Sequence, residues 1–298
     1  MNDITYYNTF HKIELINKGM SGDRKYYIQT KDGAKRLLRV SKISEYEQKK
    51  SEFEAMKKLV QLGIPMSQPI DFGICDNGKS VYILISWIEG DEVEEKLPNM
   101  TYAMQYKLGV ESGKILHKIH TCPAPNDADQ WSKRYLTVID ERLQAFIKEG
   151  VPFEGDKIIL NYLEENKYLL YDRPQCHHHG DYHMGNLIIS PEEQLYVIDF
   201  HMVDFENYGD PWYEFNRLGV EFPAFASGQI DGYFNSNPPE EFWKLLIYYL
   251  IASAITSIVW SKYFAPERLE SIIKLNKDIL AWTDNLKNPI PSWYVNHF

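Results

Sequence analysis

This 298-residue chain contains three polar residues whose types and spacing suggest a metal-binding or catalytic site: Asp181, Asn186 and Asp199. Two short apolar runs, 187–189 and 195–198, flank the turn-forming segment Ser-Pro-Glu-Glu-Gln and predict a β-hairpin. Antiparallel pairing of these runs would return Asp199 to the side of Asn186. A carboxylate and an amide oxygen suit a hard cation such as Mg²⁺, which prefers oxygen ligands and keeps some for phosphate. Asp181, in the loop that enters the hairpin, is then placed to accept a hydroxyl proton or to orient a nucleophile.

Four histidines near Asp181 suggest a zinc site as an alternative: His177, His178, His179 and His183. A zinc site needs three or four ligands that converge on one ion. Consecutive residues of an extended segment point to alternating sides, so neighbouring histidines face one ion only with difficulty. We therefore expect His179 and His183 to brace the loop through hydrogen bonds instead.

A candidate phosphate-binding loop lies near the N-terminus, where residues 13–16, 26–29 and 37–40 predict three strands. The turn between the first two contains Gly19 and Ser21. Its backbone N–H groups and the Ser21 hydroxyl could bind phosphate oxygens, although a plain hairpin turn is the alternative.

A candidate ion pair joins the third of these strands to the segment that follows it. Residues 46–62 predict a helix by the spacing of their apolar side chains, and Glu52 and Glu54 lie in its first half. Most charges on such a helix face solvent. Because a cation that binds phosphates often needs a carboxylate to fix its rotamer, Arg39 on the preceding strand would be a partner for one of the two glutamates.

The remaining elements change in type along the chain. Residues 81–85 predict an apolar strand, and residues 86–90 break the regular structure, so we place a domain boundary near Glu89. The part before it is mainly sheet, and the part after it is predicted to be helical over residues 102–119, 131–149, 156–170, 212–218, 241–262 and 266–285. The uncharged run 245–261 is too short for a membrane span and predicts a buried helix.

Composition narrows the class of protein. The chain is 44% hydrophobic and 25% charged, as in an ordinary globular protein, and has a net charge of −10. The acidic balance argues against a nucleic-acid partner and is compatible with a cationic one, although it also serves solubility. Three cysteines without CxxC spacing indicate neither a disulfide framework nor a zinc knuckle. The N-terminus lacks a signal-peptide pattern, and we expect a cytoplasmic protein without a membrane partner.

Three motifs together resemble a known family. They are His-Gly-Asp-Tyr-His-Met-Gly-Asn at 179–186, Val-Ile-Asp-Phe at 197–200 and Gly-Asp-Pro at 209–211. Their order and separation closely resemble the catalytic and metal-binding signature of the aminoglycoside phosphotransferase family. The resemblance implies an α+β, protein-kinase-like fold of two lobes. We expect a small antiparallel-sheet lobe with one helix, residues 1–88, to bind nucleotide, and a mainly helical lobe, 89–298, to carry catalysis and substrate binding.

The resemblance also implies roles for single residues. Asp181 becomes the catalytic base, and Asn186 and Asp199 become the ligands of Mg²⁺ on ATP. The nucleotide-binding set it implies is Gly19, Ser21, Arg39, Glu52 and the main chains of Ser86 and Ile88. Asp210 would anchor the loop that follows Asp199. Two departures stand out, because Arg39 replaces the family's lysine and Asp199 is followed by Phe200-His201, without the glycine that protein kinases have after this aspartate.

The function implied is an ATP- and Mg²⁺-dependent O-phosphotransferase that acts on a hydroxyl of a small, cationic molecule. An aminoglycoside or another antibiotic is one acceptor class, and a metabolite of the choline or amino-sugar type is the alternative. A kinase-like binding protein without turnover is a second alternative, and a protein kinase is disfavoured because residues 199–209 leave no room for a long activation loop. Acidic candidates for an acceptor pocket are Asp204, Glu206, Glu214, Glu221 and Asp231.

Overall fold

The structure is a computed structural model that describes residues 1–17, 22–200 and 207–295. The predicted phosphate-loop residues Gly19 and Ser21, and the acidic candidates Asp204 and Glu206, lie outside the described residues. The chain divides into two compact units. The first comprises Met1–Glu95 and Gly185–Asp199, and the second comprises Lys96–Met184 and Phe200–Phe298.

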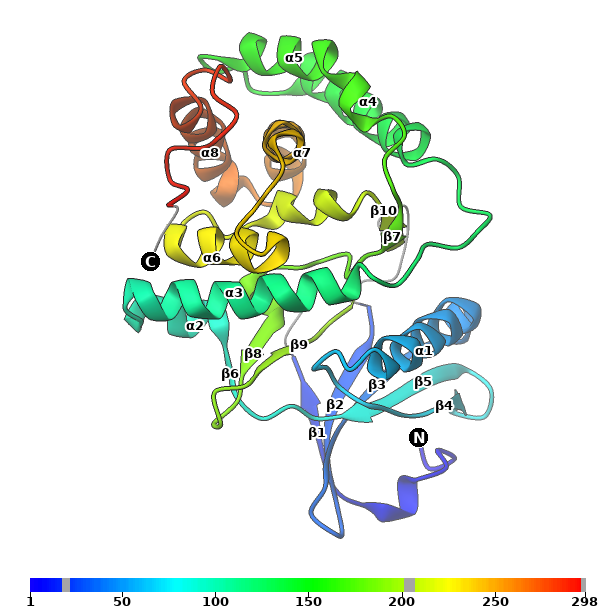
Figure 1. Cartoon of the computed structure of the whole chain (residues 1–298). Helices are drawn as coiled ribbons and strands as arrows, with labels where there is room; N and C mark the ends of the chain where they lie inside the picture. The colour runs from blue at the N-terminus through cyan, green and yellow to red at the C-terminus, as the bar shows by residue number, and fades with distance from the viewer. Residues whose placement is uncertain (18–21, 201–206, 296–298) are drawn as a thin grey trace. The chain divides into compact units, whose positions relative to one another are not determined.

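The first unit is built on a five-stranded antiparallel sheet with helix α1 beside it (Figure 1). The strand order is β1-β2-β3-β5-β4, and the elements are β1 (Phe10–Ile16), β2 (Arg24–Thr30), β3 (Lys35–Lys42), α1 (Tyr46–Gln61), β4 (Pro69–Cys75) and β5 (Ser80–Ser86). Short 3-10 helices, Tyr7–Thr9 and Ile43–Glu45, precede β1 and α1. The three strands and the helix expected before residue 62 are therefore present.

The two faces of this sheet differ in polarity because successive side chains of a strand point to opposite sides. One face is apolar and includes Ile28, Leu38 and Leu84, which form a buried cluster with Ile4 of the N-terminal segment. The other face carries charged side chains on β2 and β3, next to buried apolar ones on β5 such as Ile83. Lys25 of β2 lies opposite Arg39 of β3 in the antiparallel register, so both side chains project to the same side of the sheet.

The predicted hairpin completes the first unit. Strands β8 (Leu187–Ile189) and β9 (Leu195–Val197) pair, and β6 (Asp91–Glu92) joins them on the β8 side. Gly90 allows this junction, since a Cβ there would lie 2.3 Å from the Ile189 carbonyl oxygen and its φ is +146°. By packing, residues 89–95 and the hairpin thus belong with the sheet, whereas the sequence places its boundary near Glu89 and assigns both segments to the second lobe.

The second unit is mainly helical, with α3 lying along α6 (Figure 1). Its long elements are α3 (Tyr102–Ile119), α4 (Trp131–Glu149), α5 (Asp156–Glu165), α6 (Pro223–Phe234), α7 (Glu240–Phe264) and α8 (Leu269–Trp282). Its short elements are the paired strands β7 (Cys176–His177) and β10 (Tyr208–Gly209) and the 3-10 helices Lys167–Leu170, η7 (Pro211–Arg217) and Pro266–Arg268. The short helices Val93–Lys96 and Leu97–Asn99 lead into this unit. A sheet-based unit and a helical unit confirm the predicted α+β, kinase-like fold.

Helix α7 is the core of the second unit. It is long and apolar enough to span a membrane by composition, but 78% of its most apolar window is buried inside the protein. Its Tyr249 stacks edge-on against Tyr135 of α4 and Tyr213 of η7. Such burial is typical of a core helix, as the length of the uncharged run indicates.

Strand β4 and helix α6 were not predicted, for reasons of local sequence. Strand β4 includes Pro69, Asp71 and Gly73, which weaken any strand pattern. Helix α6 includes Gly228 and Gly232, which lower helix propensity but allow close packing on α3. A Cβ at Gly232 would lie 2.0 Å from the Val110 carbonyl oxygen, so the glycines serve the contact between helices.

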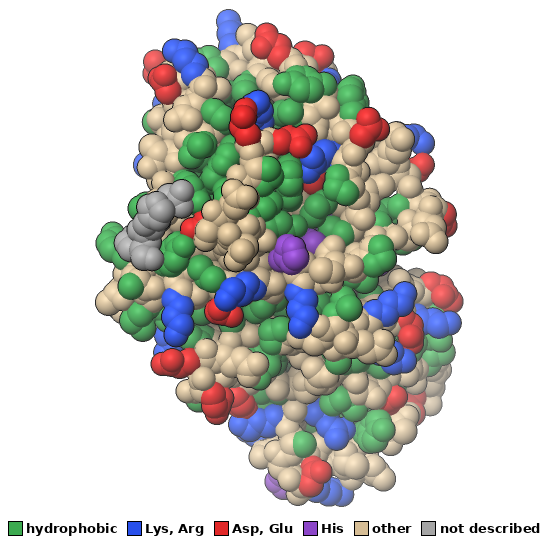
Figure 2. All heavy atoms as spheres, in the orientation of Figure 1, with side chains coloured by type: hydrophobic (Ala, Val, Ile, Leu, Met, Phe, Trp, Pro, Cys, Tyr) green, Lys and Arg blue, Asp and Glu red, His purple; other side chains and the backbone are tan. Residues whose placement is uncertain are grey.

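Charge is dispersed over the surface. Figure 2 shows Lys and Arg side chains interspersed with Asp and Glu across the face that it draws. This face therefore mixes side chains of both charge signs.

Candidate active site

The hairpin brings the two expected metal ligands together in the first unit. The Ile198 N–H donates to the Asn186 carbonyl oxygen at 3.0 Å, which places Asp199 one residue beyond the residue opposite Asn186. Asn186 is buried. Asp199 has φ +58°, a left-handed conformation that aspartate tolerates better than most residues. Unusual backbone angles of this kind cluster at functional sites.

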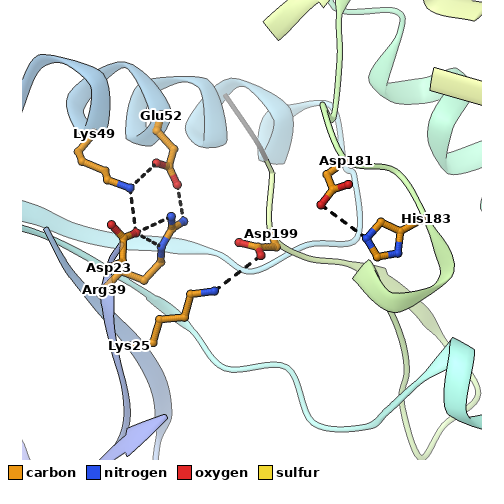
Figure 3. Close-up of polar contacts among 8 residues, drawn as sticks. All are labelled: Asp23, Lys25, Arg39, Lys49, Glu52, Asp181, His183 and Asp199. Carbon is orange, nitrogen blue, oxygen red and sulfur yellow. Dashed lines mark hydrogen bonds and ion pairs between the residues drawn. The ribbon is translucent and has the colours of Figure 1, made fainter. Parts of the chain in front are cut away.

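Four charged side chains form a buried cluster on the polar side of the sheet (Figure 3). Arg39 donates through Nη1 to Glu52, through Nε to Asp23 Oδ2 at 2.9 Å and through Nη2 to the same oxygen at 2.7 Å. Lys49 Nζ lies 2.8 Å from Asp23 Oδ2 and 3.4 Å from Glu52 Oε2. The four side chains are only 3–10% exposed. The structure thus pairs Arg39 with Glu52 and adds a second acid and a second base.

Arg39 and Asp23 of this cluster favour each other's ionised form. Burial alone would lower the pKa of Arg39, but the carboxylates of Glu52, Asp23 and Asp199 outweigh it and raise that pKa above its ordinary value. Burial alone would raise the pKa of Asp23. The positive charge of Arg39, with hydrogen bonds from Lys49 and Ser41, instead holds the pKa of Asp23 well below its usual range.

A further cation faces the predicted metal ligand. Lys25 Nζ lies 3.7 Å from Asp199 Oδ2, and Figure 3 shows the lysine reaching from its strand toward this carboxylate. The side chain of Lys25 is 13% exposed and that of Asp199 is 43% exposed.

Asp181 is held in the second unit by two basic side chains. Arg217 Nη1 donates to its Oδ1, and His183 Nε2 lies 3.5 Å from its Oδ2. Burial alone would raise the pKa of Asp181, but the His183 hydrogen bond and the charge of Arg217 outweigh it and lower the pKa to about 2. Asp181 is therefore a carboxylate at neutral pH and a weak base.

The loop that precedes Asp181 is fastened by Glu214 of η7. This carboxylate accepts the N–H groups of His179 at 2.7 Å and of Gly180 at 2.8 Å. It also contacts His120 Nε2 at 2.9 Å, and His120 Nδ1 contacts the Tyr233 hydroxyl at 2.9 Å. Burial lowers the pKa of His120 to about 3, so the neutral ring donates to Glu214, which can only accept.

The residues expected to brace or anchor this region, His179, His183 and Asp210, all make polar contacts. The His179 ring accepts the Asp181 N–H at 3.2 Å, and His183 contacts the Asp181 carboxylate. Asp210 is fully buried and accepts hydrogen bonds from Arg173 Nε at 2.7 Å, the Tyr249 hydroxyl at 2.8 Å and the Trp212 N–H at 3.0 Å. Asp210 therefore caps η7, the helix that carries Glu214 and Arg217.

The two residues expected to meet adenine lie at the end of β5 and after it. The Ser86 N–H donates to the Gln68 carbonyl oxygen at 2.9 Å, and its hydroxyl accepts the Gln68 N–H at 2.8 Å. The Ser86 N–H is therefore already engaged with the segment before β4. Ile88 lies in the irregular segment between β5 and β6.

The sequence matches the Phosphotransferase enzyme family over residues 12–243. The chain belongs to this family. No curated protein matches the chain significantly.

Solved structures of several kinases share the fold of this family member. The amicoumacin kinase hAmiN, in complex with AMP-PNP, Ca²⁺ and Ami, matches with a TM-score of 0.60 and 12% identity over 95% of this chain and 92% of that chain. A choline/ethanolamine kinase family protein from Mesorhizobium loti matches with a TM-score of 0.65 and 13% identity over 97% and 95%. The GDP complex of aminoglycoside 2'-phosphotransferase-IIIa matches with a TM-score of 0.62 and 14% identity over 94% of each chain. These likenesses show a kinase-like fold.

Several residues that contact the candidate site residues were not predicted from the sequence. Asp23 and Lys49 join the Arg39 cluster, and Arg217 pairs with Asp181. Two acidic pocket candidates have structural partners, since Glu214 accepts the His179 N–H in the loop before Asp181, and Asp231 accepts the hydroxyls of Tyr106 and Tyr294. The signal that could have found Lys49 is its i, i+3 spacing to Glu52.

Proposed function

We propose that this chain transfers a phosphoryl group from ATP to a hydroxyl of a small molecule in a Mg²⁺-dependent reaction. The observation that carries the proposal is the hairpin that sets Asn186 beside Asp199. It lies in the same unit as the buried Arg39–Glu52 pair, so the features expected for nucleotide binding are parts of one packed body.

The residues present fit a magnesium ion. An amide oxygen and a carboxylate are hard oxygen ligands, and Mg²⁺ completes its shell with water and phosphate oxygens. Asn186 and Asp199 would hold the ion. When bound, it would neutralise charge on the phosphates. The partial exposure of Asp199 leaves its carboxylate accessible to such a ligand.

Asp181 would orient the acceptor hydroxyl. A carboxylate whose pKa is about 2 is ionised throughout the neutral range and removes a proton only weakly. Phosphoryl transfer passes through a loose transition state that asks mainly for positioning and charge neutralisation. The tether from Glu214 to the His179 and Gly180 N–H groups supplies that positioning.

The acceptor class is the finer part of the proposal. The kinases that share this fold include a choline/ethanolamine kinase family protein, aminoglycoside phosphotransferases and a putative fructosamine-3-kinase. All three descriptions name or imply hydroxyl compounds that carry nitrogen, which supports a small cationic acceptor.

A screen for ADP release tests the proposal. The purified chain with Mg²⁺ and ATP is assayed against aminoglycosides, other antibiotics, amino alcohols and amino sugars. Asp181→Asn keeps the shape of the side chain, and we expect it to lower turnover of an active acceptor by about 10³-fold or more. The matched control is Asp129→Asn, an exposed aspartate before α4. Full turnover by Asp181→Asn would refute the assignment.

A binding protein without turnover is the second candidate, and the Arg39 substitution favours it. Calorimetry separates the two candidates, because an active phosphotransferase must bind Mg·ATP. Saturable Mg·ATP binding together with ADP release in the screen supports the enzyme. Saturable binding of an acceptor compound without any ADP release supports the binding protein.

A further inference from the structure

Lys25 is a basic residue to which the proposed function assigns no role. It lies on β2 directly opposite Arg39 of β3, so the two side chains are neighbours on the polar side of the sheet. Its ammonium lies 3.7 Å from Asp199 Oδ2. An isolated ion pair of partly exposed side chains contributes little to stability, on the order of 0–1 kcal/mol, so folding alone gives a weak reason for this placement.

The guanidinium of Arg39, by contrast, is fully paired within the buried cluster. Its Nε, Nη1 and Nη2 atoms each donate to a carboxylate. With Lys49 included, two positive charges face two negative charges, so the cluster is neutral as a whole. A cation inside a neutral, buried cluster offers little net attraction to a polyanion. The planar guanidinium also suits fixed, bidentate pairing, whereas lysine is a compact charge on a flexible stem.

We propose that Lys25, rather than Arg39, is the residue that binds the phosphates of the nucleotide donor. Asp23 and Lys49 then act as positioning residues that hold Arg39 as a structural strut between β3 and α1. The inference rests on the proposed function. Because Asp199 would hold the metal ion on the phosphates, an ammonium that reaches Asp199 also reaches the ligands of that ion (Figure 3). The amine that binds phosphate therefore lies on β2 in this chain, next to β3, where Arg39 replaces the family's lysine.

An acyl-phosphate derivative of ATP identifies the amine directly. The ε-amine of a lysine near the phosphates attacks the acyl carbonyl, which forms an amide and releases ATP as the leaving group. A guanidinium remains protonated and does not react in this way. We expect peptide mapping of the wild-type chain to find the acyl group on Lys25, with labelling blocked by excess Mg·ATP. Blockable labelling of Lys49 or another lysine, with Lys25 unmodified, would overturn the inference.

Equilibrium binding provides an independent test. We expect Lys25→Met to weaken Mg·ATP binding in calorimetry by about 10-fold or more, with adenosine affinity and the melting temperature unchanged. Lys25→Arg should restore part of the lost affinity because it keeps the charge. The matched control is Lys12→Met on β1, whose half-exposed side chain pairs with Glu14. Unchanged Mg·ATP affinity in Lys25→Met would overturn the inference.

The two proposals fail in different ways. If the wild-type chain neither binds Mg·ATP nor reacts with the acyl phosphate, the proposed function fails, and the assignment of Lys25 fails with it. If the wild-type chain binds Mg·ATP and Lys25→Met binds it equally well, only the assignment of Lys25 fails.

Discussion

The two units hold their candidate functional groups by different means. In the first unit, Arg39 is fixed by side-chain ion pairs whose members come from the segment before β2, from β3 and from α1. In the second unit, the loop that carries Asp181 is fixed through its backbone, because the single carboxylate of Glu214 accepts two successive N–H groups. The first arrangement balances charge, and the second fixes the path of the chain.

Because of this difference, we expect substitutions in one arrangement to change stability and substitutions in the other to change activity. A buried ion cluster depends on each of its members, since removal of one leaves a partner charged and without compensation. A loop held by hydrogen bonds can loosen without unfolding the unit around it, and the cost then falls on the orientation of Asp181. Substitutions in the buried ion cluster of the first unit should therefore act mainly on the free energy of unfolding, and substitutions around Glu214 should act mainly on turnover.

The largest effect on stability is expected for Arg39→Leu. Loss of the guanidinium leaves Asp23 and Glu52 buried with only Lys49 between them, which should lower the free energy of unfolding by about 3–5 kcal/mol. Urea denaturation measures this change. Arg24→Leu is the control, because Arg24 is 56% exposed and pairs with Asp76 at the surface. Equal destabilisation by the two variants would refute a special role for the buried cluster.

Glu214→Gln should act in the second unit with a smaller effect on stability. The amide keeps one acceptor oxygen but cannot satisfy both N–H groups and His120 together, so we expect a loss of about 1–3 kcal/mol. Turnover should fall by about 10-fold or more because the Asp181 loop loosens. Glu221→Gln, at an exposed position, is the control. Reduced stability with unchanged turnover would show that the loop does not need this tether.

Elements that depend on interactions between residues close together in the sequence are easier to predict than contacts between residues far apart in it. Helices over 102–119 and 131–149 are predicted with the bounds that the structure gives them, because apolar spacing is a local signal. The hairpin that unites Asn186 and Asp199 is likewise local. The predicted run 156–170 is interrupted, since α5 ends at Glu165 and a 3-10 helix follows.

The partners of the site are harder to predict because they depend on register and on long-range packing. Asp23 meets Arg39 only because β2 and β3 pair in one particular register. Glu214 lies 34 residues beyond Gly180 along the chain, and nothing near either residue signals their contact. Arg217 reaches Asp181 over a similar separation. The motif residues could therefore be found from sequence, whereas Asp23, Glu214 and Arg217, which hold Arg39, the loop before Asp181 and Asp181 itself, could not.

The buried His120 makes the second unit sensitive to acid. Its folded-state pKa of about 3 is below the ordinary value of 6.5, so its contribution to stability is full above pH 6.5 and is lost as pH falls toward 3. Between pH 7 and pH 5, the free energy of unfolding should fall by about 2 kcal/mol from this group. His120→Gln should remove that part of the slope in urea denaturation. An unchanged slope would instead indicate a charged histidine paired with Glu214.

Arg217→Ala is expected to have the smallest effect, and it tests the electrostatics of Asp181. The charge of Arg217 helps to lower the pKa of Asp181 to about 2, so its removal should raise that pKa toward the ordinary value of 3.8. Turnover near neutral pH should change little for this reason, because Asp181 stays ionised. At pH 4, where the variant would be partly protonated, its turnover relative to pH 7 should fall about 2-fold below that of the wild type.

The control for this pH profile is Lys114→Ala, which removes an exposed positive charge from α3 and leaves the contacts of Asp181 intact. Parallel profiles for the wild type and Arg217→Ala would show that His183 alone sets the ionisation of Asp181. A large loss of turnover at every pH would show that Arg217 contacts the acceptor or the transferred group. In that case the second unit, like the first, would bring a basic side chain to the phosphate as well as a carboxylate to the hydroxyl.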